Sequence, residues 1–192
     1  MRIGMLGGTF NPPHLGHLVL AGESLRRFEL DKVVFIPAFI PPHKDVAYGV
    51  SQQDRMEMVR LAVAGEPAFE ISTYEIDKEG ISYSIESIEH FQKENGSLAE
   101  LFFLTGADSI SVLSTWKEIG RILELTTFVV ASRPGWRIEG PYEGEVKHLV
   151  IPEVDISSSM IRECVKDAKS IDDFVPPTVA EYIRKKGLYR QG

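Results

Sequence analysis

Short apolar runs alternate along the chain with longer stretches in which apolar side chains recur every three or four positions. The short runs are typical of buried strands, and the longer stretches are typical of amphipathic helices. Strands are predicted at Arg2–Leu6, Lys32–Pro37, Phe69–Ile76, Glu100–Thr105, Thr127–Ala131 and His148–Ile151. Helices are predicted at Leu15–Phe28, Gln52–Ala64, Ile85–Glu94, Ser158–Ala168 and Thr178–Lys186, with a broken pair near Ser109–Leu123. This alternation predicts an α/β fold, with a doubly wound, mostly parallel sheet covered by helices on both faces.

Two of the predicted helices carry sequence signals at their ends. Ser51, followed three residues later by Asp54, approximates a capping box. The basic run 184–186 precedes Gly187, which is typical of a helix C-terminus and predicts a mainly structural role for these cations. No internal repeat or linker interrupts the pattern, so residues 1–192 are expected to form a single domain.

Composition narrows the class of protein. The chain has 21 Lys and Arg against 28 Asp and Glu, and its net charge of -7 argues against nucleic-acid binding. The amino terminus does not resemble a signal peptide and the apolar runs are too short to span a bilayer. We therefore expect a cytoplasmic protein with no membrane partner. The single cysteine, Cys164, excludes an intramolecular disulfide, and its apolar helical setting predicts packing rather than nucleophilic catalysis.

The segment between the first predicted strand and helix reads Gly-Gly-Thr-Phe-Asn-Pro-Pro-His-Leu-Gly-His, from Gly7 to His17. Gly7 and Gly8 permit a tight turn and a close approach of the backbone to a ligand. Backbone N–H groups at the helix start would attract an anion, and His14 and His17 are spaced to face one ligand. A simple turn would explain the glycines, and the histidines could be half of a metal site, but no carboxylate or cysteine has the partnering spacing. The ordered combination favours a phosphate site.

A second cluster follows the apolar strand near residue 104. Gly106 permits another close backbone approach, and Asp108 could either cap the next helix or accept hydrogen bonds from a ribose. Further on, Trp116 offers a flat face to an aromatic ring, against the alternative of a core position.

A third cluster, Ile156 to Arg162, opens a predicted helix with three consecutive serines. Redundant helix caps would explain these serines. Ser158 or Ser159, together with Arg162 one turn later, could instead grip a polyphosphate. In a doubly wound sheet, the loops after the first and fourth strands flank one crevice where the winding reverses. Residues 7–17 and 106–108 are therefore expected to line a common site, with this helix closing one side.

Together these motifs resemble the nucleotidyltransferase superfamily, and in particular its nicotinate mononucleotide adenylyltransferase branch. Residues 7–17 match the pattern G-G-x-F-x-P-x-H-x-G-H, and residues 106–116 resemble G-x-D followed by L-x-x-W. Residues 156–162 resemble I-S-S-T-x-I-R, with Ser159 in place of threonine. Asp54-Arg55 with Met58 resembles D-R-x-x-M, although a structural role alone would explain Arg55. The resemblance covers nearly the whole chain and implies a Rossmann-like nucleotidyltransferase fold.

The resemblance assigns one group of residues to ATP. Thr9, His14 and His17 would hold the triphosphate and stabilise the transition state, while Ser159 and Arg162 would hold the departing pyrophosphate. His14, His17 and Arg162 are thus the candidate catalytic residues. The complete set implied for ATP is Gly7, Gly8, Thr9, Phe10, His14, His17, Gly106, Asp108, Ile156, Ser158, Ser159 and Arg162. Mg²⁺ would bridge phosphate oxygens with few protein ligands, so no dedicated metal-binding residues are predicted.

A second group is implied for the acceptor, a pyridine mononucleotide. Lys44 and Arg133 could pair with its 5′-phosphate, although either could equally be a solvated surface charge. Trp116 would stack on the pyridine ring. Ser84, where the family usually has threonine, and the backbone amide of Lys117 would receive the nicotinate carboxylate.

The function that the resemblance implies is adenylyl transfer from ATP to nicotinate mononucleotide, giving deamido-NAD and pyrophosphate in NAD biosynthesis. The transfer would proceed by direct in-line attack, without a covalent enzyme intermediate. One alternative is a pantetheine-phosphate adenylyltransferase, although that family is shorter and lacks the L-x-x-W element. Another is a nucleotide-binding protein without turnover, against which the intact His14, His17, Ser159 and Arg162 argue. Relatives of this kind also suggest a homo-oligomer.

Overall fold

The computed structural model describes residues 1–42, 50–132, 134–135, 142–152 and 154–190. Six strands form one sheet in the order β3-β2-β1-β4-β5-β6. Every neighbouring pair is parallel. The strands are β1 (Arg2–Gly8), β2 (Lys32–Pro37), β3 (Phe69–Ile71), β4 (Glu100–Gly106), β5 (Thr127–Ser132) and β6 (Lys147–Val150). The predicted doubly wound α/β fold is confirmed, with the winding reversing between β1 and β4.

Helices cover both faces of the sheet because its central strands are apolar on both sides. Leu20 of α1 and Val59 of α2 pack on one face, and Ile88 of α4 and Ile122 of α5 pack on the other. The helices are α1 (Leu15–Arg27), α2 (Gln52–Val63), α3 (Tyr74–Lys78), α4 (Ser84–Asn95), the 3₁₀ helix η1 (Ala107–Thr115), α5 (Ile119–Leu125), α6 (Ser158–Lys166) and α7 (Pro177–Lys186). None of the described helices is long and apolar enough to cross a membrane.

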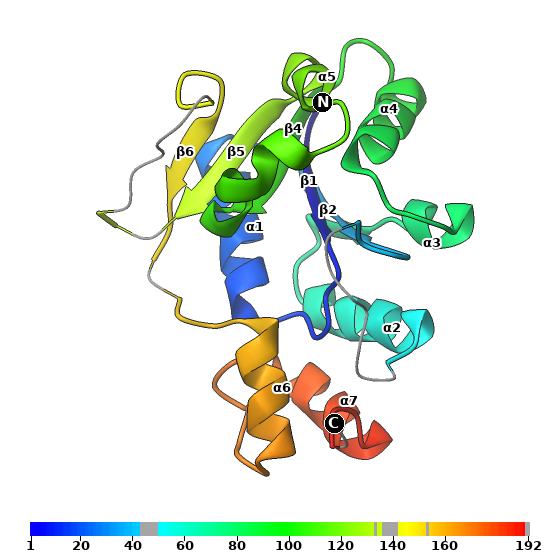
Figure 1. The fold of residues 1–192 in the computed structure, drawn as a ribbon, viewed down its shortest axis with the longest axis vertical. Coiled ribbons are helices and arrows are strands. Elements are labelled where there is room, and N and C mark those ends of the chain that lie inside the picture. The colour runs from blue at the N-terminus through cyan, green and yellow to red at the C-terminus, as the bar shows by residue number, and fades with distance from the viewer. Residues whose placement is uncertain (43–49, 133, 136–141, 153, 191–192) are drawn as a thin grey trace.

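A third apolar core lies beyond the carboxyl ends of the strands. There Met58 of α2 packs with Ile161 of α6 and Val179 of α7. Figure 1 shows α6 and α7 at the lower end of the molecule, with the C-terminus beside α7 and the N-terminus at the opposite end. Cys164 lies half-buried against this core, as the sequence predicted.

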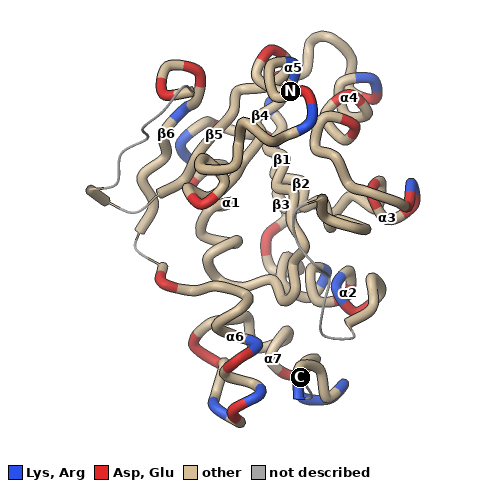
Figure 2. The backbone as a smooth tube through the Cα atoms, in the orientation of Figure 1, with Lys and Arg blue, Asp and Glu red and all other residues tan. Residues whose placement is uncertain are grey.

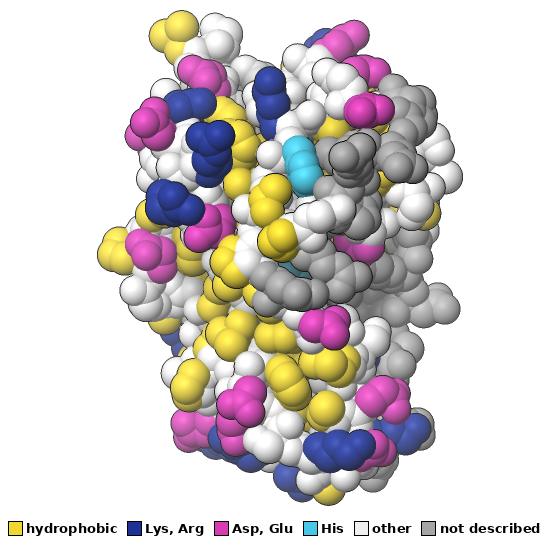
Figure 3. Space-filling model, turned by 90° about the vertical axis from the view of Figure 1, so that its left-hand side faces the viewer, with side chains coloured by type: hydrophobic (Ala, Val, Ile, Leu, Met, Phe, Trp, Pro, Cys, Tyr) yellow, Lys and Arg dark blue, Asp and Glu magenta, His cyan; other side chains and the backbone are white. Residues whose placement is uncertain are grey.

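The surface carries both signs of charge. Figure 2 shows acidic and basic residues interspersed on the outer helices α3, α4, α6 and α7. Seen from the β6 side, hydrophobic side chains gather across the middle of the molecule (Figure 3).

The predicted strand Phe69–Ile76 is wrong beyond Ile71. The Ser72 N–H still donates to the Phe35 carbonyl of β2, but the Tyr74 N–H turns back to the Ser72 Oγ. Hydroxyl side chains compete with strand pairing in this way, and α3 begins at Tyr74.

Other predicted features hold. The Ser51 Oγ accepts the Asp54 N–H at the start of α2, and α7 ends at Gly187, whose φ of 66° is left-handed. The broken helical pair is also confirmed, as η1 followed by α5.

Candidate active site

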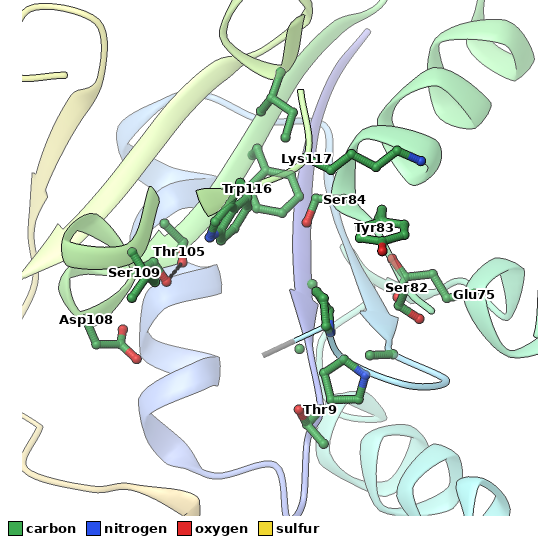
Figure 4. Close-up of a pocket in the computed structure, with 18 residues that line it drawn as sticks. Thr9, Glu75, Ser82, Tyr83, Ser84, Thr105, Asp108, Ser109, Trp116 and Lys117 are labelled. Atoms are coloured by element: carbon green, nitrogen blue, oxygen red, sulfur yellow. Dashed lines mark hydrogen bonds between the residues drawn. The ribbon is translucent and has the colours of Figure 1, made fainter. Parts of the chain in front are cut away.

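The site lies where the sheet winding reverses. β1 pairs with β2 on one side and with β4 on the other, so the loops after Gly8 and Gly106 diverge from neighbouring strand ends. A cavity of about 370 Å³ opens there, a volume within the range of small-molecule sites. The sequence-predicted residues that line it are Gly7, Gly8, Thr9, Ser84, Asp108, Trp116 and Lys117. Figure 4 shows Thr9 at one end of the cavity and Trp116 with Ser84 at the other.

The segment from Gly7 to His17, named here the phosphate corner, is shaped by the buried ring of Phe10. Phe10 has a left-handed φ of 48° and is only 2% exposed. A Cβ on Gly8 would lie 3.1 Å from this ring, so a larger residue at this position would force it to move. The glycine therefore lets the loop close tightly around Phe10, whose predicted contact with ATP is through the backbone.

His14 and His17 lie one helical turn apart, with ring centroids separated by 3.8 Å. His14 is the N-cap of α1, and its backbone N–H donates to Nδ1 of His17 over 3.1 Å. Because Nδ1 accepts, the neutral His17 ring carries its proton on Nε2 and is a hydrogen-bond donor there. A Cβ at Gly16 would lie 3.0 Å from the His14 ring, which explains the small residue between the histidines.

The protonation of His14 is set by its surroundings. Its side chain is buried at the start of α1, and burial lowers the pKa of His14 to about 4. The ring is therefore neutral near pH 7 in this structure. A neutral imidazole can donate one N–H hydrogen bond to a phosphate oxygen. It contributes no positive charge unless a bound anion raises its pKa.

Helix α6 reaches the phosphate corner from the other end of the chain. Ser157 caps α6 by accepting the Met160 N–H, but Ser158 instead donates its hydroxyl to the Pro12 carbonyl over 2.8 Å. Arg162 donates from Nη1 to the Asn11 carbonyl at 2.8 Å and from Nη2 to the Ser159 Oγ at 2.9 Å. Ile156 lies just before the helix, partly buried against the third core. The serine-rich cluster is thus more than a set of caps, because Ser158 and Arg162 bond α6 to the phosphate corner.

Asp108 follows β4 on the opposite rim of the cavity. Asp108 lies within the first turn of η1, whose N-cap is Gly106, and so does not occupy the cap position that the sequence allowed. The carboxylate is exposed and lies over Gly106, where a Cβ would come within 2.7 Å of Oδ1. Gly106 is therefore needed for this arrangement, which leaves Asp108 able to accept hydrogen bonds from a ligand in the cavity.

Trp116 packs on the core and also lines the cavity, so the two roles that the sequence left open do not exclude each other. Its ring meets Phe103 and Phe128 of the core in T-shaped arrangements, with centroid separations of 5.7 and 5.8 Å. It is only half-buried and also lines the cavity, near Ser84 in Figure 4. The core thus fixes the indole, and the ring remains available to a ligand.

The start of α4 lies across from Trp116. Ser84 is the first residue of this helix, and Tyr83 makes no side-chain cap bond. The Lys117 ammonium lies 2.9 Å from the Glu86 carboxylate and 4.5 Å from the centre of the Tyr83 ring. Uncapped N–H groups at a helix start favour an anion, and the charge of Lys117 is balanced here by Glu86 in the first turn of α4.

Two predicted acceptor contacts cannot be placed. Lys44 and Arg133 both lie outside the described residues.

Several residues at the site were not singled out from the sequence as site residues. The buried carboxylate of Glu75 and the buried hydroxyl of Ser82 line the acceptor end of the cavity. The Asn11 side chain accepts a hydrogen bond from Tyr189 over 2.6 Å. Arg55, for which the sequence left a purely structural role open, is fully buried and donates to the Thr9 carbonyl at 2.8 Å and more weakly to the Phe39 carbonyl at 3.3 Å. For Glu75, the sequence offered one signal of burial, because this charged residue stands between the apolar side chains of Tyr74 and Ile76.

Comparison with known proteins places this architecture in a family. Residues 5–164 match the family model described as Cytidylyltransferase-like. A relative from Halalkalibacterium halodurans, named "Probable nicotinate-nucleotide adenylyltransferase", is 42% identical over 98% of this chain and 91% of its own length. The chain belongs to the nicotinate-nucleotide adenylyltransferase family. A second member, from Geobacillus thermodenitrificans and of the same name, is 43% identical over 98% of this chain and 86% of its own.

Solved structures confirm the fold of this nicotinate-nucleotide adenylyltransferase family member. Nicotinic acid mononucleotide adenylyltransferase from Plasmodium falciparum, complexed with NaAD, superposes with a TM-score of 0.77 at 20% identity. The superposition covers 100% of this chain and 98% of the other.

Proposed function

We propose that this enzyme transfers the AMP group of ATP to nicotinate mononucleotide, giving deamido-NAD and pyrophosphate for NAD biosynthesis. The observation that carries the proposal is the cavity between the ends of β1 and β4. One end is formed by Gly7, Gly8 and Thr9 of the phosphate corner, and the other by Trp116 and the start of α4. A triphosphate at the corner and a pyridine ring beside Trp116 would bring the two reacting phosphates together. The family names point to the same reaction.

The proposed chemistry needs alignment and charge neutralisation rather than a protein nucleophile. An oxygen of the acceptor's 5′-phosphate attacks the α-phosphorus of ATP, the bond between that phosphorus and the bridging oxygen breaks, and pyrophosphate leaves. No net proton or electron transfer is required. His17 would donate from Nε2 to a phosphate oxygen, and Arg162, oriented by the Asn11 carbonyl, would hold the pyrophosphate with Ser159.

The site also fits a magnesium ion that arrives with ATP. Within the described part of the chain, no three His, Cys, Asp or Glu side chains group as a metal site. Asp108 supplies one exposed carboxylate at the cavity, so phosphate oxygens and water would provide most ligands. The bound ion would neutralise charge on the triphosphate.

Preference for nicotinate over its amide follows from the acceptor end. In the described part of the structure, the N–H groups of Ser84 and Ile85 have no protein acceptor, and neither has that of Lys117. Backbone donors at a helix start bind a carboxylate better than a neutral amide, because both the hydrogen bonds and the helix dipole favour negative charge.

Product analysis tests this function. The purified full-length chain is incubated with ATP, Mg²⁺ and one acceptor, and products are separated and identified by mass. Nicotinate mononucleotide, nicotinamide mononucleotide and 4′-phosphopantetheine serve as acceptors. We expect deamido-NAD and pyrophosphate in equal amounts, and a kcat/KM at least about tenfold higher for nicotinate than for the amide.

Three outcomes would contradict the proposal. A higher kcat/KM for the amide would overturn the nicotinate assignment. Adenylation of 4′-phosphopantetheine in preference to either pyridine nucleotide would favour the alternative enzyme. Binding of ATP with no product from any acceptor would indicate a nucleotide-binding protein.

A further inference from the structure

Glu75 is a buried acid at the edge of the proposed acceptor site. It lies on the short helix α3, is 5% exposed and lines the cavity. Figure 4 shows it beside Ser82, across the cavity from Asp108. Burying a carboxylate costs free energy unless hydrogen bonds compensate, so its presence here needs a reason.

One buried serine hydroxyl of α4 bonds this carboxylate, and a second serine just before the helix lies beside it. The Ser87 Oγ donates to Oε1 of Glu75 over 2.5 Å, and Ser87 is 1% exposed. The Ser82 Oγ, which lies beside Glu75, accepts the Phe39 N–H at 2.9 Å. Since Ser87 lies near the start of α4, its bond to Glu75 ties the end of the helix that carries Ser84 to α3.

The same network continues to the phosphate corner. The Phe39 carbonyl accepts from Arg55 at 3.3 Å, and Arg55 also donates to the Thr9 carbonyl at 2.8 Å. A hydrogen-bonded chain thus runs from Thr9 through Arg55 and Phe39 to Ser82, which lies beside Glu75. It connects the segment proposed to hold ATP with the helix start proposed to hold the acceptor.

The residue type suits this task. A carboxylate has two acceptor oxygens and can satisfy two hydroxyl donors, whereas an amide has one acceptor oxygen and brings two donors of its own. Burial raises the pKa of Glu75, while the hydroxyls of Ser87 and Ser82 and the charge of Lys78 act in the opposite direction. Glu86 is the other carboxylate whose charge acts on it.

We propose that Glu75 is a positioning residue for the mononucleotide: by holding Ser87 it fixes the amides at the start of α4 that receive the ring carboxylate. This inference rests on the proposed function. It predicts that Glu75 affects recognition of the acceptor's carboxylate specifically, and ATP much less, because Arg55 holds the Thr9 end independently.

The decisive experiment measures steady-state kinetics of Glu75→Gln with nicotinate and nicotinamide mononucleotides. We expect the KM for nicotinate mononucleotide to rise at least tenfold and the KM for ATP to change less than threefold. The ratio of kcat/KM for nicotinate to that for the amide should fall at least tenfold, which a merely structural role would not produce. Asp77→Asn is the matched control, because it removes the same charge from an exposed position of α3 and should leave all constants unchanged.

Ser87→Ala provides a second, milder test in which the carboxylate is retained and one of its donors is lost. It should raise the same KM severalfold, and it keeps the proposal testable if Glu75→Gln does not fold. Equal changes in both KM values, or an unaltered nicotinate-to-amide ratio in the folded variants, would overturn the role of Glu75. A wild-type enzyme that makes no dinucleotide from nicotinate mononucleotide would instead overturn the proposed function, and this inference with it.

Discussion

His14 is buried at the start of α1, and its ring is neutral near pH 7 because burial lowers its pKa to about 4. In the unfolded chain the pKa of histidine is near 6.5, so the unfolded state binds a proton first as the pH falls. The contribution of the neutral His14 ring to the free energy of unfolding is therefore fully present above about pH 6.5, and it is lost between about pH 6.5 and 4. Relative to His14→Gln, the wild-type free energy of unfolding should fall by about 3 kcal/mol over this range. Urea unfolding at a series of pH values measures it, and a difference between the two proteins that does not change with pH would contradict the prediction.

His17 combines two tasks that substitution can separate. Its Nδ1 accepts the His14 N–H at the start of α1, and its Nε2 is the proposed donor to phosphate. His17→Asn keeps an acceptor near Nδ1 but loses the distant donor, whereas His17→Ala loses both. We expect both variants to lower kcat by about 10²- to 10³-fold, and the alanine variant alone to lose about 1 kcal/mol of stability. Rapid-quench turnover and thermal unfolding measure these effects; near-normal turnover in either variant would remove His17 from the chemistry.

The site residues that could be identified from the sequence are those that belong to short local motifs. Gly8 and the two histidines occur at one strand-to-helix junction, and their spacing predicts a common ligand. Glu75 carries only the weak signal of a charge between two apolar neighbours, and its partner Ser87 is supplied by tertiary packing. The partner of Asn11, Tyr189, is supplied in the same way. Lys44 and Arg133 remain predictions.

At the scale of elements, α6 is coupled to the phosphate corner through Arg162. Its two donors bond the Asn11 carbonyl and the Ser159 hydroxyl, a geometry that a lysine with one ammonium cannot reproduce. Arg162→Lys should therefore retain the charge but lower kcat at least about tenfold. Lys166→Gln, which removes an exposed cation from the far end of α6, is the matched control. Equal activity of Arg162→Lys and the wild-type enzyme would show that charge alone matters.

Secondary structure was predictable where periodicity was strong and failed where side chains competed with the backbone. The apolar strands β1, β2 and β4 were predicted to within two residues of their ends. The run after Phe69 also reads as a strand, but the Ser72 hydroxyl captures the Tyr74 N–H and the chain turns into α3. That turn places Glu75 at the cavity, where we propose that it positions the start of α4.

For the whole molecule, the position of the crevice between the first and fourth strands could be inferred, because the winding of a doubly wound sheet reverses there. The neighbouring ends of β1 and β4 then predict the position of the site. The contribution of the C-terminus could not be inferred in this way. The third core, shared by α2, α6 and α7, brings the last turn of the chain to the phosphate corner, and only long-range packing determines that contact.

Tyr189 makes this contact and provides a test of it. Its ring is 4% exposed, and its hydroxyl donates to the Asn11 side chain over 2.6 Å, beside the carbonyl that holds Arg162. Tyr189→Phe keeps the packing but removes this hydrogen bond to a buried acceptor, which should cost about 1–2 kcal/mol of stability and, by loosening Asn11, lower kcat severalfold. Tyr182→Phe removes a hydroxyl bonded to Asp54 in the same core, at a less buried position, so kcat should stay at the wild-type value. Chemical denaturation with parallel turnover assays distinguishes them: if both variants lose stability and neither loses turnover, the C-terminal turn supports the fold without acting on the site.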